Sequence, residues 1–583
     1  MADPFVRACR WAAAKVPTGR RRVVPRDGAL QRALELAGLP LAPEEVRALA
    51  ILVAILTVVP AIAAVILCPW LGGPWFLAVP ALAVPAIASA SVLGHPEARA
   101  ARVRRTCVAE TPALVGYLAM SLSVCPSLDR AIAFAAEHAA GPTAALLRRV
   151  LWDVHLRARM RIEDASGALA ERVGTWNGEL KQALHVVIHA AREGSPDGLP
   201  QALDRAREIA YEGARRRWQD YGVALKGPTS ALFALGVLLP MIVGSMLPLL
   251  SLGAFSPSAI EVPRATTTDP VPWILLLDVA FPAATFAFAY RVSAKHPGVV
   301  VPRRSRAKGW PLLGCVTGGG VLVAVLVIAV PSIPLMVPFV TAVGCASVFL
   351  FATTRHEARG RKAREALSRD FPDALFQLGS RLGEGRGLEE GLLAVADASQ
   401  GTGVAPLFGR IARSLRLAGG SAEASALGSL PEETPAPIRA SLRMVVDLAA
   451  QDPAVAGRAI VELSSHLRDL QGIERDLGAE IRPTVDAMRT TALVFAPIVL
   501  GVTGALYELL GRAFATIASL PMDPSTFLVA LGVYLVFTSA AILYFVVRIE
   551  ARGPSSLGAS LARALPVGTA TFLGTWFAAR LAF

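Results

Sequence analysis

Residues 112–131 read PALVGYLAMSLSVCPSLDRA, and residues 372–391 read PDALFQLGSRLGEGRGLEEG, a gap-free match at an offset of 260 residues. Pro112 aligns with Pro372, and leucines, small residues and an acidic residue stay in step along the rest of the match. In both segments the leucines recur at the spacing of a helix rather than at the alternation of a strand. A repeat of this kind predicts a duplicated helical domain.

The similarity continues beyond the first match and reaches an apolar segment in each copy. With small gaps, residues 226–229 (KGPT) align with residues 481–484 (IRPT). Farther along, Pro240 within LPM aligns with Pro497 within API. Each copy is therefore expected to be a helical bundle that leads into a proline-bearing membrane helix.

The composition indicates that the bilayer is the main solvent of this chain. Of its 583 residues, 54% are hydrophobic and only 18% are charged. A membrane-spanning helix needs about 20 mostly apolar residues, and nine stretches reach or approach that length. These stretches are residues 49–68, 75–93, 228–252, 271–290, 311–330, 335–354, 491–510, 527–547 and 564–583.

Charge in the short loops sets the expected orientation. Residues 291–310 carry six Lys and Arg side chains and no acid, so the positive-inside rule places this loop in the cytoplasm. Counting outward from it, the N-terminus and both long polar regions are cytoplasmic, and the C-terminus lies outside. The expected organisation is a cytoplasmic arm at 1–48, two spans within 49–93, a bundle domain at 94–227, four spans within 228–354, a second bundle domain at 355–490, and three spans within 491–583.

The expected fold is an all-α, polytopic membrane protein with about nine transmembrane helices and two homologous cytoplasmic bundle domains. Neither domain contains the runs of alternating Val, Ile and Thr that would indicate strands. In the first domain, Thr111 is expected to cap a helix that has Pro112 in its first turn.

These features resemble a known family of membrane proteins. The repeated helical domain opens with Pro and turns through a small residue, Leu and an acid into a second helix. A Gly-containing segment (residues 190–194, AAREG) precedes a membrane helix. This arrangement looks like the F-domain of type II secretion and type IV pilus platform proteins. Two copies and about nine spans look most like the archaeal members, the platforms of archaella and archaeal pili. The second copy departs from this pattern, because residues 450–452 read AQD where the first copy reads REG.

The resemblance implies a homodimeric platform in the cytoplasmic membrane that has no enzymatic activity of its own. The partners it implies are a cytoplasmic secretion ATPase, pilin-like subunits and the lipid bilayer. Which filament such a platform would build, for motility, adhesion or DNA uptake, stays open.

The residues themselves also argue against an enzyme. A phosphate-binding P-loop requires a Gly-Lys pair, and the chain has none. The GxSxG motif of serine hydrolases is missing, and the six cysteines include no CxxC pair. We therefore expect no cofactor and no metal site. The net charge of +13 is accounted for by topology, so no nucleic-acid partner is expected.

Basic side chains gather near the expected cytoplasmic boundary of the membrane, where anionic lipid attracts each Lys or Arg by roughly 1 kcal/mol. The simpler interpretation is that these side chains contact lipid. The more specific interpretation is that some of them contact an acidic surface of the ATPase. The candidate residues are Arg215, Arg216, Arg217, Arg303, Arg304, Arg306, Arg355, Arg359, Arg361 and Lys362.

Asp278 is the one acid well inside an apolar stretch, and a carboxyl group in the bilayer is costly enough to be a functional candidate. The Asp278 carboxyl group could form a hydrogen bond that fixes helix packing, or it could relay protons. Because repeats and a buried acid also occur in transporters, a secondary transporter is the leading alternative function. A non-catalytic membrane scaffold that docks partners is the third.

Overall fold

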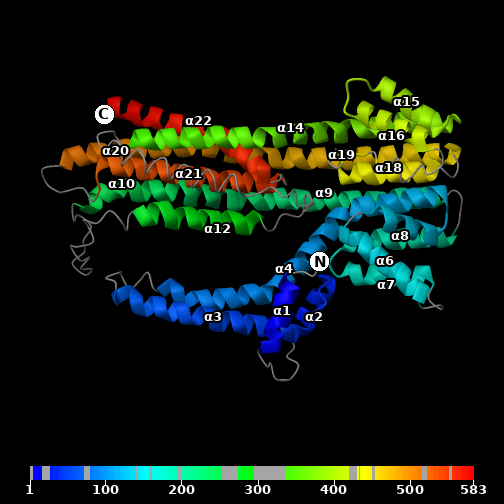
Figure 1. Ribbon diagram of the computed structural model, residues 1–583, viewed down its shortest axis with the longest axis horizontal. Helices are drawn as coiled ribbons and strands as arrows, with labels where there is room; N and C mark the ends of the chain where they lie inside the picture. Colours follow the sequence, from blue (N-terminus) through cyan, green and yellow to red (C-terminus); the bar gives the residue numbers. More distant parts are fainter. Residues whose placement is uncertain are drawn as a thin grey trace.

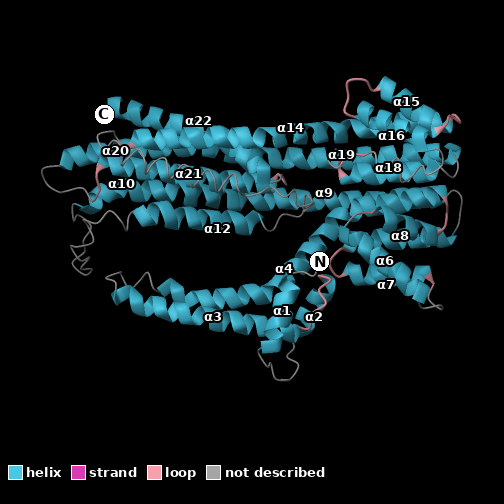
Figure 2. Ribbon diagram, in the orientation of Figure 1, coloured by secondary structure: helices cyan, strands magenta, loops and turns pink. Residues whose placement is uncertain are grey.

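The computed structural model describes residues 4–15, 27–70, 79–139, 141–156, 161–193, 198–251, 274–293, 335–418, 428, 430–431, 434–449, 453–514, 522–550 and 554–582. Every regular element in this described part is a helix, as the sequence predicts (Figure 2). The molecule is elongated, and long helices join an apolar end to an end built of short helices (Figure 1). We call these the apolar end and the bundle end.

Three long helices connect the two ends, namely α9 (Gly198–Phe233), α14 (Met336–Gly383) and α19 (Pro453–Thr490). A fourth, α4 (Val79–Val124), runs from an N-terminal hairpin into the bundle end (Figure 1). The apolar end adds α10 (Leu239–Ser251), α12 (Phe281–Ser293), α20 (Ala496–Phe514), α21 (Pro524–Ile549) and α22 (Pro554–Ala582). Three π-helical segments interrupt the helices of the apolar end, namely η2 (Ala234–Leu238), η4 (Leu276–Ala280) and η5 (Thr491–Phe495).

Short amphipathic helices make up the rest of the bundle end. The first copy supplies α5 (Leu128–His138), α6 (Gly141–Leu156), α7 (Ile162–Gly174) and α8 (Gly178–Glu193). The second supplies α15 (Leu388–Ala398), α16 (Val404–Ala418) and α18 (Ala436–Ala449). Each buries one stripe of apolar side chains, because an apolar residue at every third or fourth position falls on one helix face.

The N-terminal part forms a separate hairpin. Helix α3 (Pro43–Trp70) packs along the first part of α4, and α1 (Pro4–Lys15) and α2 (Asp27–Leu36) pack against the base of this hairpin (Figure 1). Cys9, Leu34 and Val46 are buried there in a small core of their own.

Four helices in the described residues are long and apolar enough to cross a membrane, namely Gly198–Met246, Met336–Gly383, Val455–Ala513 and Pro524–Ile549. They contain the predicted spans at 491–510 and 527–547 and most of the predicted spans at 228–252 and 335–354. The predicted spans at 49–68, 75–93, 271–290 and 564–583 overlap described helices that are not among these four. The predicted span at 311–330 lies outside the described residues.

Thr111 does not cap a helix, so this prediction is wrong. Thr111 and Pro112 both lie inside α4, which continues from the hairpin into the bundle end. The Thr111 hydroxyl donates to the Cys107 carbonyl at 3.0 Å and accepts a 2.8 Å bond from the Asn177 side-chain amide. Its polar group thus ties α4 to the start of α8, because a continuous helix offers it no free backbone N–H to cap.

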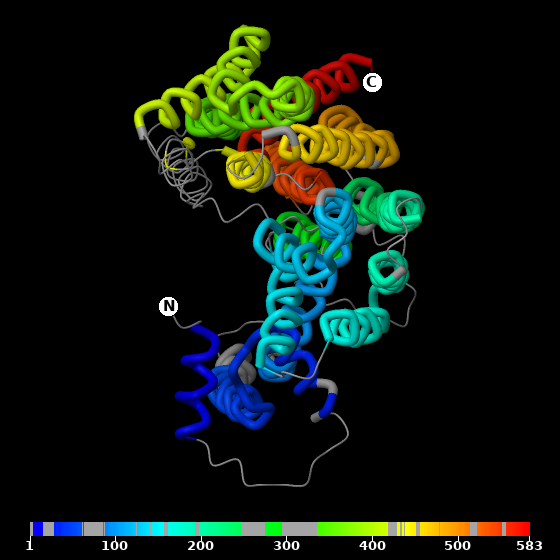
Figure 3. Tube along the Cα trace, turned by 90° about the vertical axis from the view of Figure 1, so that its right-hand side faces the viewer, coloured from blue at the N-terminus to red at the C-terminus, as the bar shows by residue number. Residues whose placement is uncertain are grey.

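The two copies share one hydrophobic core. A single cluster of buried side chains includes Leu118 and Leu122 from the first copy and Leu378 and Leu382 from the second. All four are fully buried, and each contributes about 1.5–3 kcal/mol to the free energy of unfolding. The copies meet where α19 packs against α4 and α9 (Figure 3).

Candidate functional site

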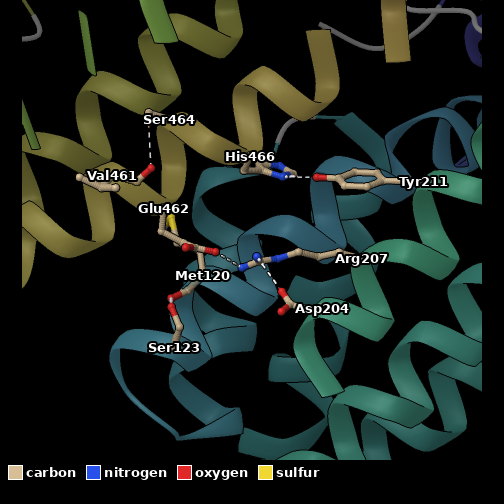
Figure 4. A network of polar contacts seen from close by, with 9 residues as sticks. All are labelled: Met120, Ser123, Asp204, Arg207, Tyr211, Val461, Glu462, Ser464 and His466. Atoms are coloured by element: carbon tan, nitrogen blue, oxygen red, sulfur yellow. Dashed lines mark hydrogen bonds and ion pairs between the residues drawn. The ribbon is translucent and has the colours of Figure 1, made fainter. Parts of the chain in front are cut away.

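The joint between the copies is built around Tyr211 on α9 and His466 on α19. The Tyr211 hydroxyl and His466 Nδ1 share a hydrogen bond of 2.7 Å (Figure 4). The imidazole also packs against α4 at Gly116, where an added Cβ would lie 1.9 Å from His466 Cε1. Glycine at position 116 therefore makes room for the ring that joins the copies.

His466 is held neutral by its surroundings. Its side chain is buried, and burial, followed by the positive charge of Arg207, lowers the pKa of His466 to about 3. Protonation of the ring inside the folded joint is therefore strongly disfavoured at any pH near neutral.

An ion pair lies beside the ring. The Arg207 guanidinium contacts the Glu462 carboxylate on α19 and lies 3.4 Å from Asp204 on its own helix (Figure 4). Asp204 and Arg207 share a face of α9 with Tyr211, because residues three or four positions apart meet on one side of a helix. The Arg207 side chain is 18% exposed and that of Glu462 is 35% exposed, so this pair is partly shielded from solvent.

Three π-helical segments mark the apolar end, and each ends two residues before a proline. η2 precedes Pro240, η4 precedes Pro282 and η5 precedes Pro497. A proline lacks an N–H, and its ring clashes with the carbonyl four residues earlier, so a wider turn relieves the helix there. η2 and η5 occupy the same place relative to the two prolines that align between the copies.

Helix α21 contacts all three proline segments. It packs against η4 and η5, and the Tyr534 hydroxyl donates a 2.7 Å hydrogen bond to the Gly236 carbonyl in η2. Residue 240 would be the α-helical donor to Gly236, but proline there cannot donate. Tyr534 is fully buried, so its hydroxyl satisfies a carbonyl that water does not reach.

Asp278 lies in η4, which packs against α21. Its Oδ1 is buried and has no hydrogen-bond partner among the described residues. Thr538 and Thr285 flank Gly236, with their methyl carbons 3.5 and 3.3 Å from the position that a Cβ at residue 236 would occupy. Small and hydroxyl-bearing residues thus line the contact of η2 with α12 and α21.

The three consecutive arginines at residues 215–217 do not form one patch. Arg217 is 24% exposed, pairs with Glu179 on α8 at 2.8 Å and also donates to a backbone carbonyl of α4. Arg216 is 75% exposed and pairs within its own helix, whereas Arg215 lies 4.0 Å from Asp476 on α19. Arg217 therefore holds the first bundle together, whereas the side chains of Arg215 and Arg216 are 63% and 75% exposed and project toward solvent.

The other basic candidates divide into two groups. Arg355, Arg359 and Lys362 are exposed along α14, and Arg361 lies 3.6 Å from Glu365 on the same helix. The candidates at positions 303, 304 and 306 lie outside the described residues.

No group of His, Cys, Asp or Glu side chains in the described part of the chain could hold a metal ion. Comparisons with protein-family models, curated proteins and solved structures give no match to this chain. The candidate site consists of the joint between Tyr211 and His466, the two proline-bearing helices Gly198–Met246 and Val455–Ala513 that run from this joint into the apolar end, and α21, which contacts both helices.

The sequence did not single out Gly116, Tyr211, His466 or Tyr534. Gly116 falls within the first quoted segment but looks there like an ordinary small residue between leucines. The prolines alone gave a usable signal, because a proline inside an apolar helix requires a neighbour that satisfies the freed carbonyl.

Proposed function

We propose that this chain is the membrane platform of a type IV pilus-like, archaellum-like or type II secretion-like assembly machine. In this proposal the bundle end is cytoplasmic, the apolar end crosses the cell membrane with about nine spans, and the chain works as a homodimer. A cytoplasmic secretion ATPase moves the bundle end, and pilin-like subunits pass from the bilayer into a growing filament.

Mechanical continuity between the two ends is the observation that carries the proposal. Gly198–Met246 and Val455–Ala513 are each one helix from the bundle end into the apolar end. Tyr211 and His466 tie these helices together in the joint. A displacement of the joint therefore reaches the apolar end along two parallel helices at once.

The proline segments are where such a displacement would be absorbed. Helices bend at prolines and π-helical turns because the regular ladder of backbone hydrogen bonds is broken there. Both continuous helices have this break at equivalent places, next to α21. In the proposal α21 moves relative to η2 and η5 when the ATPase shifts the bundles.

Deletion of the gene tests this function. We expect the deletion strain to lose its surface filaments under negative-stain electron microscopy while its pilin-like subunits remain in the membrane at normal amounts. A plasmid-borne wild-type copy should restore the filaments. Filaments at wild-type number in the deletion strain would refute the proposal.

A secondary transporter is the second candidate, favoured by the unpaired buried Oδ1 of Asp278. Proton uptake into proteoliposomes that contain the wild type but not Asp278→Asn would support transport. The platform proposal expects no uptake in either case, and it expects Asp278→Asn to assemble filaments.

A further inference from the structure

Helix α16 turns a basic and apolar face away from the core. Arg410, Arg413 and Leu417 follow one another at three- and four-residue spacing, which places them on one side of the helix. Leu417 is 88% exposed. The two arginines are exposed and donate only to carbonyls of their own helix. This face therefore has no partner among the described residues.

Helix α6 of the first copy has the same kind of face. Arg149, Trp152 and Leu156 follow the same three- and four-residue spacing and are all exposed. Trp152 is 65% exposed and Leu156 is 66% exposed. A tryptophan and a leucine this open on a folded bundle are unusual, because burying them would remove a large apolar area from water.

The two faces occupy equivalent places in the repeat. Each follows an 11-residue helix, α5 in one copy and α15 in the other. Arg149 matches Arg410 and Leu156 matches Leu417 at the same offset of 261 residues. The buried positions stay in step as well, since Val150 in α6 and Ile411 in α16 both face the core. The outward faces thus share Arg and Leu at two of their three positions, whereas Trp152 aligns with Arg413.

Their position separates these faces from the membrane. Both helices lie in the bundle end, away from α10, α20 and α21, and the joint formed by α9 and α19 lies between them (Figures 1 and 3). A lipid surface beside the apolar end is therefore not their natural partner. Arg, present on both faces, and Trp, present on α6, are enriched in protein-binding hot spots, and the positive charge favours an acidic partner.

We propose that α6 and α16 are two equivalent docking surfaces for one acidic protein that presents its binding site more than once. Two separated copies of one surface suit a partner with repeated subunits, because simultaneous engagement raises the effective affinity. The identification of this partner as the ATPase rests on the proposed function. The assignment of α6 and α16 as docking surfaces does not depend on that function.

Site-specific photocrosslinking of the full-length chain in its native membranes tests the surfaces. The photoreactive residue p-benzoylphenylalanine replaces Trp152 in one variant and Leu417 in another, and the adducts are identified by mass spectrometry. We expect the same acidic protein at both positions. Arg149→Glu and Arg410→Glu should each reduce the adduct on their own helix by about tenfold, the factor given by 1.4 kcal/mol.

Arg458→Glu is the matched control. Arg458 is exposed on α19, outside both surfaces, and its reversal changes net charge equally, so the adducts should stay at wild-type yield. Adducts with lipid or nucleic acid, different proteins at the two positions, an equal loss with Arg458→Glu, or no adduct from a correctly folded chain would each overturn the docking surfaces.

The identity of the captured protein separates this proposal from the proposed function. If one acidic protein is found at both positions and it is a secretion ATPase, both proposals stand. If it is an acidic protein of another kind, the docking surfaces stand and the platform function fails.

Discussion

The Tyr534 hydroxyl donates to the Gly236 carbonyl over 2.7 Å, which is the carbonyl that Pro240 deprives of its α-helical donor. The bond links α21 to the π-helical segment through which the first copy's long helix enters the apolar end. In the second copy the Ser539 hydroxyl of α21 lies 3.5 Å from the Ala492 carbonyl in η5. One helix thus meets the equivalent break in both copies.

Tyr534→Phe tests this bond. Removing the hydroxyl takes from the buried Gly236 carbonyl the donor that α21 supplies, so we expect a loss of about 1–2 kcal/mol in the free energy of unfolding. Tyr544→Phe on the same helix removes a hydroxyl that has no hydrogen-bond partner among the described residues, and it should change stability by less than about 0.5 kcal/mol. Thermal unfolding in nanodiscs measures both, and equal effects would contradict the role given to Tyr534.

Gly116→Ala should destabilise the joint, because its Cβ would lie 1.9 Å from the His466 ring. Overpacking of this kind typically costs about 1–3 kcal/mol. Combining it with His466→Ala should cost less than the sum of the single changes, since the smaller side chain frees the space. Gly167→Ala on α7 is the control, because nothing lies within 4 Å of its Cβ position.

The depressed pKa of His466 predicts how stability changes with pH. The folded state holds this pKa at about 3, against 6.5 for an unperturbed histidine, so below pH 6.5 only the unfolded chain takes up the proton. The contribution of His466 to stability is therefore complete above pH 6.5 and is lost as pH falls toward 3, by up to about 1.4 kcal/mol per pH unit. Unfolding between pH 7 and 4 should be less pH-dependent in His466→Gln than in the wild type, and an equal pH dependence would contradict the buried, neutral state of the ring.

Arg217 and Arg216 should respond differently to charge reversal. Arg217→Glu places a second acid beside Glu179, 2.8 Å from the present guanidinium, so we expect a loss of about 2–4 kcal/mol. Arg216→Glu should cost less than about 1 kcal/mol because its pair is exposed. Chemical unfolding checks both, and the exchange Arg217→Glu with Glu179→Arg should recover part of the loss. A similar stability for the two single variants would contradict the structural role of Arg217.

The sequence predicted the helical fold well because apolar spacing and membrane-length segments are local properties. The aligned prolines Pro240 and Pro497 also pointed to equivalent membrane helices, and both follow a π-helical segment. Thr111 was misassigned because a Thr-Pro pair is typical of a helix start, whereas here α4 tolerates Pro112 inside a continuous helix.

The joint could not be predicted from the sequence. Gly116 and His466 are 350 positions apart, and neither belongs to a pattern that indicates contact. The three arginines at residues 215–217 were wrongly predicted to act as one patch. A run of arginines looks uniform in sequence, but the helix directs each of the three side chains to a different side. Only packing separates Arg217, bound to Glu179, from the exposed Arg216.

Purification of the tagged full-length chain from native membranes in mild detergent tests the central claim most directly. Mass spectrometry of the eluate should identify a secretion ATPase that remains bound to the folded, monodisperse chain. An eluate in which the chain is folded and monodisperse but carries no such ATPase would contradict the platform function.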